Sequence, residues 1–350
     1  MFVRPAPMSR VPRVSVMVPC YNYGRYLPQV LAALSDQPGV DVDVLIVDDA
    51  STDGSGEVAE RLAAETAGVS VLRHRENQGH ISTYNDGLAA VTGDYVVLLS
   101  ADDLLPPGAL GRAVALMEAH PRVGLVYGYA RSFTDDPPEV DPRVRNWSVW
   151  KGLDWLGASA RKGRCFISSP EVVMRRDALL DAGCRYDPRL PHSGDFDMWL
   201  RTAVNWDIGR VNGPVQALYR VHDANMHLTV FAGWLTDLRE RRTTFEILFD
   251  ERALTRPQVT RLRPQAMRAL AREALSHALA AHREHAAPDL VSGYIEFALE
   301  TDASVRGSLL WRACELGPLR DRALPAAVPL RFASKVRHHL SWRLERRYGT

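Results

Sequence analysis

The sequence predicts an α/β fold in which a mostly parallel, doubly wound central sheet is followed by a helical C-terminal region. Short apolar runs alternate with segments of helical periodicity between residues 14 and 129, which is typical of repeated β-α units. The connections between these segments are short, as in other doubly wound sheets. From about residue 231 the chain is rich in Arg, Ala and Leu, and prolines divide it into several predicted helices. We therefore expect an α/β domain over residues 1–230 and a helical region over residues 231–350.

Five short runs of β-branched and other apolar residues are the predicted strands of this sheet. They are Val14–Val18, Val42–Val47, Val69–Leu72, Tyr95–Leu99 and Val123–Tyr129. The second and fourth of these runs are nearly all apolar, as expected of strands that are buried on both faces of a parallel sheet. A ligand of such a sheet binds at the carboxyl ends of its strands.

Segments with a helical pattern lie between the predicted strands. They are Leu27–Leu34, Glu57–Thr66, a segment with Ile81, Tyr84, Leu88 and Val91 on one face, and a helix from Pro106 to about His120. Residues 130–170 are predicted to be irregular, and a helix is predicted to begin near Asp195. Residues Ile208–Val221 are predicted to form a strand pair around Asn212-Gly213-Pro214.

The composition of the chain excludes several classes of protein. Of its 350 residues, 46% are hydrophobic and 24% are charged, which is ordinary for a globular protein. The net charge of +1 gives no electrostatic case for a nucleic-acid partner. The four cysteines form no C-x-x-C pattern, the first residues lack the apolar core of a secretory signal, and no run approaches the ~18 apolar residues of a membrane span.

We therefore expect a cytoplasmic protein. The basic segment Arg331–Arg347 near the C-terminus is a candidate for contact with the acidic inner face of the cell membrane. An ordinary packed or solvated helix is the alternative for this segment.

Polar residues follow three of the predicted strands. Pro19-Cys20-Tyr21-Asn22 follows the first strand, Asp48-Asp49 the second, and Ser100-Ala101-Asp102-Asp103 the fourth. Two acidic pairs at one edge of a sheet are costly unless solvent or a cation compensates their charge. The chain has neither a G-x-G-x-x-G after the first strand nor a G-x-x-x-x-G-K-[ST] motif, which disfavours a dinucleotide site and a P-loop.

Five motifs, taken together and in this order, resemble the family 2 glycosyltransferases of the GT-A fold, a Rossmann-like sandwich. They are VSVMVPCYN at 14–22, VLIVDDASTD at 44–53, YVVLLSADD at 95–103, GDFDMWLR at 194–201 and YRVHDANM at 219–226. The resemblance implies an inverting enzyme that moves a sugar from a nucleotide-diphosphate donor, with UDP or dTDP favoured by family habit. The acceptor would be a hydroxyl of a saccharide, a glycolipid or a natural product.

The resemblance also implies a role for each matching residue. Asp195 matches the general base, which takes the proton of the acceptor hydroxyl. Asp102, with Asp103 or His222 assisting, matches the ligands of a Mn²⁺ or Mg²⁺ ion that bridges the donor phosphates. The positions that match contacts to the nucleotide are Pro19, Tyr21, Asn22, Asp48, Asp49, Asn77, Gly79, Asn85, Asp102 and Arg220.

The sequence departs from the family pattern at several positions, Thr83 among them. Ser100 stands first in a motif that reads Asp-x-Asp-Asp in many members, and Gly194 replaces a frequent Glu before the base. Tyr84 stands where Arg is common, which leaves the donor contact of that arginine open.

The candidate residues also have purely structural interpretations. Asp48-Asp49 and Asp195 could cap helices, Asp102-Asp103 could belong to a solvated loop, and His222 could be an ordinary hydrogen-bond partner. Trp147, Trp150 and Trp155 fit either stacking on an acceptor sugar or simple packing.

Two other functions stay open at this point. One is a non-catalytic protein that binds nucleotide sugars or carbohydrates, and the other is a sugar-phosphate nucleotidyltransferase on a similar fold. The intact Asp195 counts against the first alternative, and the poor phosphate loop after the first strand counts against the second.

Overall fold

The computed structural model describes residues 2–5, 7–223, 225 and 233–320, without the side chains of 316–320. The chain divides into two units. The first unit contains residues 1–155 and 167–223, and the second contains residues 156–166 and the chain from 224 onward. Residues 156–166 therefore belong to the second unit, whereas the predicted division at residue 230 assigns them to the first.

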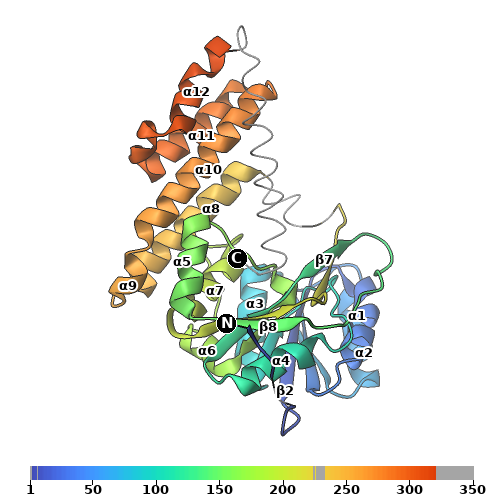
Figure 1. The fold of residues 1–350 in the computed structure, drawn as a ribbon. Helices are drawn as coiled ribbons and strands as arrows, with labels where there is room; N and C mark the ends of the chain where they lie inside the picture. The colour runs from blue at the N-terminus through green and yellow to red at the C-terminus, as the bar shows by residue number, and fades with distance from the viewer. Residues whose placement is uncertain (1, 6, 224, 226–232, 321–350) are drawn as a thin grey trace. The chain divides into compact units, whose positions relative to one another are not determined.

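The predicted α/β fold is confirmed, and the first unit is built on one nine-stranded sheet (Figure 1). All five predicted strands form, as β2 (Arg13–Cys20), β3 (Asp41–Asp48), β4 (Val69–Arg73), β5 (Tyr95–Leu98) and β6 (Val123–Tyr127). The other strands are β1 (Phe2–Val3), β8 (Asn146–Trp150), β9 (Val173–Arg175) and β10 (Asp207–Asn212). The order across the sheet is β1-β8-β10-β6-β9-β5-β2-β3-β4.

The strand order reverses next to β2. This strand pairs in parallel with β3 on one side and with β5 on the other. In open α/β sheets, ligands bind outside the carboxyl ends of the strands at such a reversal. The ends of β2 and β5 are therefore the expected ligand position in this fold.

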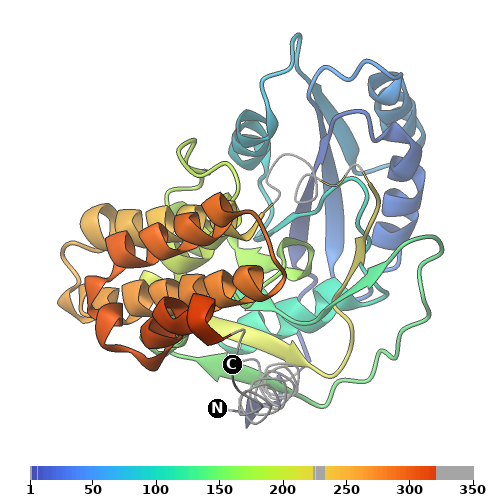
Figure 2. The same ribbon diagram turned by 90° about the horizontal axis from the view of Figure 1, so that it is seen from above.

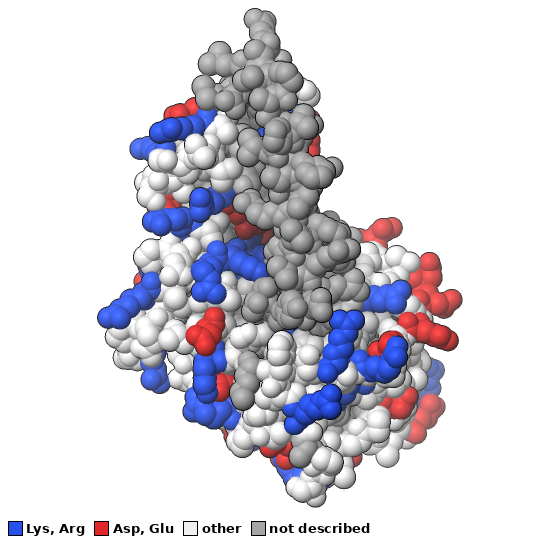
Figure 3. All heavy atoms as spheres, in the orientation of Figure 1, with Lys and Arg blue, Asp and Glu red and all other residues white. Residues whose placement is uncertain are grey.

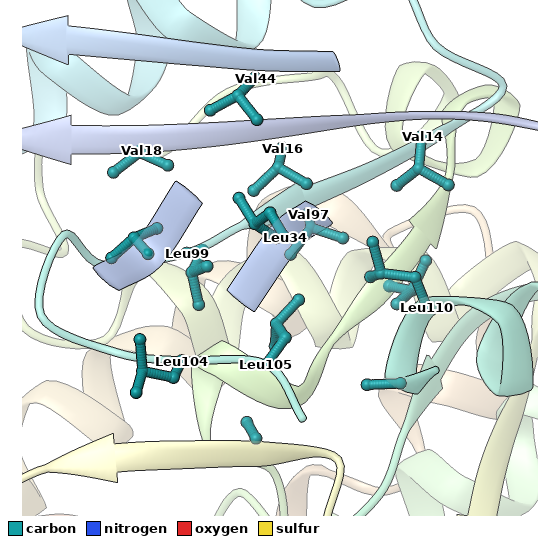
Figure 4. Packing of buried hydrophobic residues seen from close by; sticks show 14 of the residues in the cluster. Val14, Val16, Val18, Leu34, Val44, Val97, Leu99, Leu104, Leu105 and Leu110 are labelled. Atoms are coloured by element: carbon teal, nitrogen blue, oxygen red, sulfur yellow. The ribbon is translucent and has the colours of Figure 1, made fainter. Parts of the chain in front are cut away.

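Helices cover both faces of the sheet. The helices of the first unit that flank it are α1 (Leu27–Ser35), α2 (Ser55–Glu65), α3 (His80–Ala90), α4 (Ala109–Ala119), α6 (Arg176–Asp181) and α7 (Gly194–Asn205). On one face, Val16 of β2 is buried with Leu34 of α1 and Leu110 of α4 (Figure 4). On the other face α3 approaches Met17, because Gly87 has no Cβ and one there would stand 2.5 Å from the Met17 Cγ. Burying a Val, Leu or Met side chain contributes about 1.5–3 kcal/mol, so the alternation along β2 determines which helix packs on which face.

Residues 130–170 are more regular than predicted, and the prediction of an irregular segment is wrong for most of this stretch. It contains β7 (Ala130–Phe133), β8, α5 (Gly152–Lys162) and a 3₁₀ turn at Ser169–Glu171. β8 reads Asn-Trp-Ser-Val-Trp, and it forms because it pairs antiparallel with the distant β10. A short strand that depends on a remote partner leaves little local pattern in the sequence.

The three tryptophans of this stretch are part of the packed structure. Trp155 is completely buried, so it cannot stack on a sugar. The indole N–H of Trp147 donates to the carbonyl oxygen of Arg112 at 3.1 Å. Trp150 stacks on Tyr127, with 6.3 Å between the ring centroids.

The strand pair predicted over Ile208–Val221 is wrong in its pairing, although both strands form. β10 already has β6 on one edge and β8 on the other, so β11 (Ala217–Arg220) cannot join it. Instead β11 pairs in parallel with β7 in a separate two-stranded sheet.

The predicted helical C-terminal region is confirmed over the described residues of the second unit. Its helices are α8 (Trp234–Ile247), α9 (Pro257–Thr260), α10 (Arg263–Arg283), α11 (Pro288–Thr301) and α12 (Leu309–Arg320). α10 and α11 pack along each other (Figures 1 and 2), and the buried face of α10 is rich in alanine, which permits a close approach. Arg241 connects α8 with Glu273 of α10 at 2.9 Å and with the carbonyl oxygen of Gly163 at 2.7 Å.

Within the described part of the chain, none of the helices has both the length and the apolar character that crossing a lipid bilayer requires. Basic and acidic side chains are interspersed over the face of the molecule drawn in Figure 3. The segment Arg331–Arg347, the predicted membrane contact, lies outside the described residues.

Candidate active site

The acidic loop, residues 100–103, lies directly beyond β5 at the carboxyl edge of the sheet. The main chain of Leu104 exchanges two hydrogen bonds with that of Leu218, at 3.0 and 2.8 Å, which fastens the loop to β11. The acidic loop and the residues that follow β11 therefore meet, although they are far apart in the sequence.

Asp102 and His222 come together at this point. Nε2 of His222 lies 3.0 Å from Oδ2 of Asp102, and the side chain of Asp102 is 11% exposed. The imidazole also lies beside the rings of Tyr23 and Tyr26, with 5.5 and 6.0 Å between centroids. A carboxylate and an imidazole thus lie next to each other, and solvent can still reach both.

Asp103 has a different environment from Asp102. Its Oδ1 accepts a hydrogen bond from the backbone N–H of Arg220 at 2.9 Å. Its Oδ2 is buried and finds no hydrogen-bond partner among the described residues. Burial, and then the charge of Asp102, raise the pKa of Asp103 well above its usual value. A cation beside Asp102 would offset this repulsion, because a nearby positive charge favours an ionised carboxylate.

Arg220 binds the backbone of the acidic loop. Its guanidinium donates to the carbonyl oxygen of Asp102 at 3.0 Å and to Oε1 of Gln29 at 2.6 Å. The same group lies over the rings of Tyr26 and Phe133, 4.8 and 4.4 Å from their centroids. Arg220, a predicted contact of the nucleotide, therefore also holds the acidic loop in its conformation.

Asp49 ties the end of β3 to the start of α3. Its carboxylate accepts hydrogen bonds from the backbone N–H groups of Gln78 (2.8 Å) and Gly79 (2.9 Å), and Nδ1 of His74 lies 2.8 Å away. Burial raises the pKa of Asp49, but the bonds from Gln78, His74 and Gly79 outweigh it, so the pKa lies below its usual value. The carboxylate is therefore ionised and fixed in place.

Asp48 and Asp49 do not cap α2, the next helix, although Asp49 accepts backbone N–H groups at the start of α3. Asp53, not Asp48 or Asp49, accepts the backbone N–H of Ser55 at the start of α2, at 3.0 Å. Asp48 is completely buried, and its Oδ2 lies 3.4 Å from Nε of Arg73.

Other predicted nucleotide contacts shape the loops at this edge. Asn22 has a φ of 61°, and its Oδ1 accepts the backbone N–H of Thr52 at 2.8 Å. Asn77 donates to the carbonyl oxygen of Asp49 at 3.3 Å. Pro19 is half-buried at the end of β2, whereas Tyr21 is 43% exposed and can meet a ligand.

Asp195 is the second residue of α7, at the positive end of the helix dipole. The hydroxyl of Tyr186 donates to its Oδ1, and the hydroxyl of Ser169 donates to its Oδ2. Burial raises the pKa of Asp195, and the bond from Tyr186 and the nearby His80 and His192 reduce this effect. A partly exposed carboxylate with a raised pKa has the properties required of a general base.

Asp197, two residues further along α7, has a structural environment instead. It is completely buried and forms an ion pair with Nε of Arg201 at 2.9 Å. The guanidinium of Arg201 also donates to the carbonyl oxygen of Arg185 at 2.6 Å. The two aspartates of this motif therefore differ clearly in their surroundings.

Helix α3 links Asp49 with the region of Asp195. Its start binds Asp49 through Gly79, and Nε2 of His80 lies 2.8 Å from the carbonyl oxygen of Pro191, shortly before α7. Asn85, a predicted nucleotide contact, binds the backbone of Tyr186 with both ends of its amide, at 2.6 and 3.2 Å.

Tyr84 of the same helix packs on Tyr186, the residue that holds Asp195. Its ring stacks on that of Tyr186 with 4.8 Å between the centroids. Burial, and then the charge of Asp195, raise the pKa of Tyr84, with smaller contributions from Asp103 and Asp102. The charges of Asp195 and of the acidic loop therefore both act on the hydroxyl of Tyr84.

The residues present fit a divalent cation with few protein ligands. Among residues 2–5, 7–223, 225 and 233–320, no group of three or more His, Cys, Asp and Glu side chains is arranged as a metal site. Of the three predicted ligands, Asp102 and His222 come together, and Asp103 is bound to the backbone of Arg220. Mg²⁺ and Mn²⁺ sites that complete their shell with substrate phosphates and water need no more than this.

Ser169 and Tyr186, which hold Asp195, carry no sequence signal of their own. Ser169 lies in a 3₁₀ turn within the stretch predicted to be irregular, and Tyr186 lies in the loop before α7. Tyr84 is visible in the sequence as a departure from the family pattern, but its stacking on Tyr186 is not.

Comparison with known proteins supports the fold and the family resemblance. The family model "Glycosyl transferase family 2" matches residues 15–180. An uncharacterized glycosyltransferase of Nostoc sp. is 35% identical over 222 residues, which cover 62% of this chain and 67% of the relative. The Bacillus subtilis protein EpsE, named as a glycosyltransferase, is 32% identical over 196 residues, which cover 55% and 68%.

Two solved structures have a similar fold. The mannosyltransferase PcManGT from Pyrobaculum calidifontis, solved with GDP-Man and Mn²⁺, gives a TM-score of 0.58 at 18% identity and covers 98% of this chain and 85% of its own. S. aureus TarS, solved with UDP-GlcNAc, gives a TM-score of 0.56 at 15% identity, covering 84% and 91%. Together with the relatives that match over two thirds of their length, these findings show that the chain is a transferase of glycosyltransferase family 2, with the GT-A type of fold.

Proposed function

We propose that this protein transfers a sugar from a nucleotide-diphosphate donor to an acceptor hydroxyl with inversion at the anomeric carbon, and that Asp195 is the general base. The observation that supports this proposal is that Asp195 is held by Tyr186, which stacks on Tyr84, and that the pKa of Tyr84 is raised by the charges of both Asp195 and the acidic loop. A base that accepts the acceptor's proton, together with a cation that neutralises the leaving diphosphate, suits a single displacement at the anomeric carbon.

In the proposed step, the acceptor oxygen attacks the anomeric carbon while its proton passes to the Asp195 carboxylate. The bond from the anomeric carbon to the diphosphate oxygen breaks, and the nucleoside diphosphate leaves with both electrons of that bond. Tyr186 and Ser169 hold the carboxylate during this transfer. Arg220 keeps the acidic loop in position near the leaving group.

Asp102 and His222 are the residues that would hold a Mn²⁺ or Mg²⁺ ion, with Asp103 close by. When bound, the ion neutralises charge that develops on the diphosphate. Two observations support the assignment: the close pair of side chains, and the buried Oδ2 of Asp103, which lacks a hydrogen-bond partner within the described residues. The mannosyltransferase solved with Mn²⁺ is further support for a divalent ion in this family.

The donor nucleotide is proposed to lie along the ends of β2 and β3. Tyr21 offers an exposed ring, and Asp49 a fixed carboxylate that could accept from a base or a ribose hydroxyl. The similar structures were solved with GDP-Man and UDP-GlcNAc, which supports a nucleotide sugar as the donor class. UDP and dTDP remain our first choices for this chain.

A thermal-shift screen of UDP-, dTDP- and GDP-sugars with and without Mn²⁺ tests the donor class. A true donor at a hundred times its Kd should stabilise the fold by about 2.7 kcal/mol, and the shift should require the metal. If none of these nucleotide sugars raises the Tm, the donor proposal is wrong.

Removal of the metal is expected to stop transfer. In excess EDTA, turnover should fall by about 10²-fold or more, because the leaving diphosphate loses charge stabilisation worth several kcal/mol. Added Mn²⁺ or Mg²⁺ should restore it. Full activity in EDTA would contradict the role of Asp102, and release of pyrophosphate in place of nucleoside diphosphate would indicate a nucleotidyltransferase.

A further inference from the structure

We propose that Tyr186 and Ser169 are positioning residues for Asp195, and that residue 194 must be glycine because the ring of Tyr186 fills the space of its side chain. This inference rests on the proposed function of Asp195 as the base. It is argued from the contacts around the loop before α7.

Tyr186 is fixed at several points. Its backbone N–H donates to Oδ1 of Asn85 at 2.6 Å, and its carbonyl oxygen accepts from Nδ2 of the same residue at 3.2 Å. Its ring is stacked on Tyr84, and the residue is 3% exposed. Since neither the backbone nor the ring can move far, the hydroxyl is presented at one place, where it donates to Oδ1 of Asp195.

Gly194 makes room for this ring. A Cβ on Gly194 would stand 2.2 Å from Cδ1 and 2.8 Å from Cε1 of Tyr186, far inside van der Waals contact. The ring cannot turn away without losing its stacking on Tyr84, and the two backbone bonds to Asn85 keep the residue itself in place. Any larger residue at 194 would therefore push the Tyr186 hydroxyl away from Asp195, which is the next residue in the chain.

The hydroxyls of Tyr186 and Ser169 restrict the directions from which an acceptor can approach the carboxylate of Asp195. A carboxylate offers about four acceptor positions, and Tyr186 and Ser169 occupy one on each oxygen. The remaining positions are those through which an acceptor hydroxyl can approach. Donors to the ionised form also favour it, which opposes the effect of burial on Asp195. The titratable groups that act on Asp195 are Tyr186, His80 and His192, and Tyr84 is in turn affected by its charge.

Tyr186→Phe removes one donor and keeps the ring. We expect kcat to fall about tenfold with the donor KM unchanged, since a hydrogen bond to a charged group is lost. The acid limb of the kcat–pH profile should move to higher pH, because the base must be ionised and its pKa rises when a donor is removed. Ser169→Ala, a smaller change, should act in the same direction.

Tyr95→Phe is the matched control for this experiment. The hydroxyl of Tyr95 donates to Oε1 of Glu118 at 2.5 Å, at the opposite end of β5 from the acidic loop. The same atom is lost from a buried tyrosine, so stability should fall, but kcat and its pH profile should not change.

A double-mutant cycle tests the coupling of positions 186 and 194. Gly194→Ala is expected to lower the Tm by roughly 5 °C, because overpacking at a fixed ring is costly. In a Tyr186→Ala background the same change should have little effect. Equal losses in both backgrounds would show that the ring and residue 194 do not compete for space.

The outcomes separate this inference from the proposed function. If Asp195→Asn abolishes turnover but Tyr186→Phe and Ser169→Ala leave both kcat and the acid limb unchanged, the base stands and the positioning role is wrong. If Asp195→Asn leaves turnover intact, the assignment of the base itself has failed.

Discussion

Asp195→Asn is expected to lower kcat by about 10²-fold or more while donor affinity stays largely unchanged. The amide is nearly the same size as the carboxylate but cannot take the acceptor proton. Because burial raises the pKa of Asp195, the folded state disfavours the charged form, and a neutral amide should not lower the Tm. Release of nucleoside diphosphate measures kcat, a titration with the nucleotide sugar measures donor affinity, and thermal denaturation measures the Tm.

Asp197→Asn is the control for this prediction and should give the opposite result. It breaks a buried ion pair and leaves Arg201 without its carboxylate, which typically costs about 3–5 kcal/mol of stability. The Tm should therefore fall, whereas the folded fraction should keep its turnover. Loss of kcat to the same extent in both variants would mean that this part of α7 matters only for folding.

Asp102→Asn is expected to reduce kcat/KM by about 10²-fold or more and to remove the response of donor binding to Mn²⁺. Several kcal/mol of charge stabilisation at the diphosphate depend on the ion, and an amide oxygen is a much weaker ligand than a carboxylate. Donor titrations with and without Mn²⁺ on the variant, beside the steady-state kinetics, measure both effects.

Asp94→Asn serves as the comparison for Asp102→Asn. Asp94 precedes β5 at its other end and forms an exposed ion pair with Arg10 at 2.6 Å. Such pairs contribute about 0–1 kcal/mol, so neither kinetics nor metal response should change noticeably. A wild-type metal response in Asp102→Asn would show that the ion, if needed, is held elsewhere.

The strands that carry the site could be predicted because their signal is local. β2, β3 and β5 are short apolar runs that end in the polar residues of the family motifs, and a parallel strand buried on both faces tolerates few polar residues. The positions of Asp49 and Asp102 at strand ends follow directly from these boundaries. The start of α7 at Asp195 is likewise visible from helical spacing.

Features that depend on distant partners could not be predicted in this way. β8 forms because β10 offers it an edge, and β11 leaves the main sheet because both edges of β10 are taken. The position of His222 next to Asp102 follows from that second fact. A local pattern of residues contains no information about which strand edges are free.

The sequence by itself determined the α/β class, the alternating strands and helices between residues 14 and 129, and the family to which the chain belongs. It did so because apolar periodicity and strand-end motifs are properties of neighbouring residues. Only the tertiary structure decided which side chains surround Asp195, since Ser169 and Tyr186 reach it from two separate segments and Tyr84 of a third segment packs on Tyr186. The environment of this carboxylate depends on packing across the whole unit, and that packing is a long-range property of the fold.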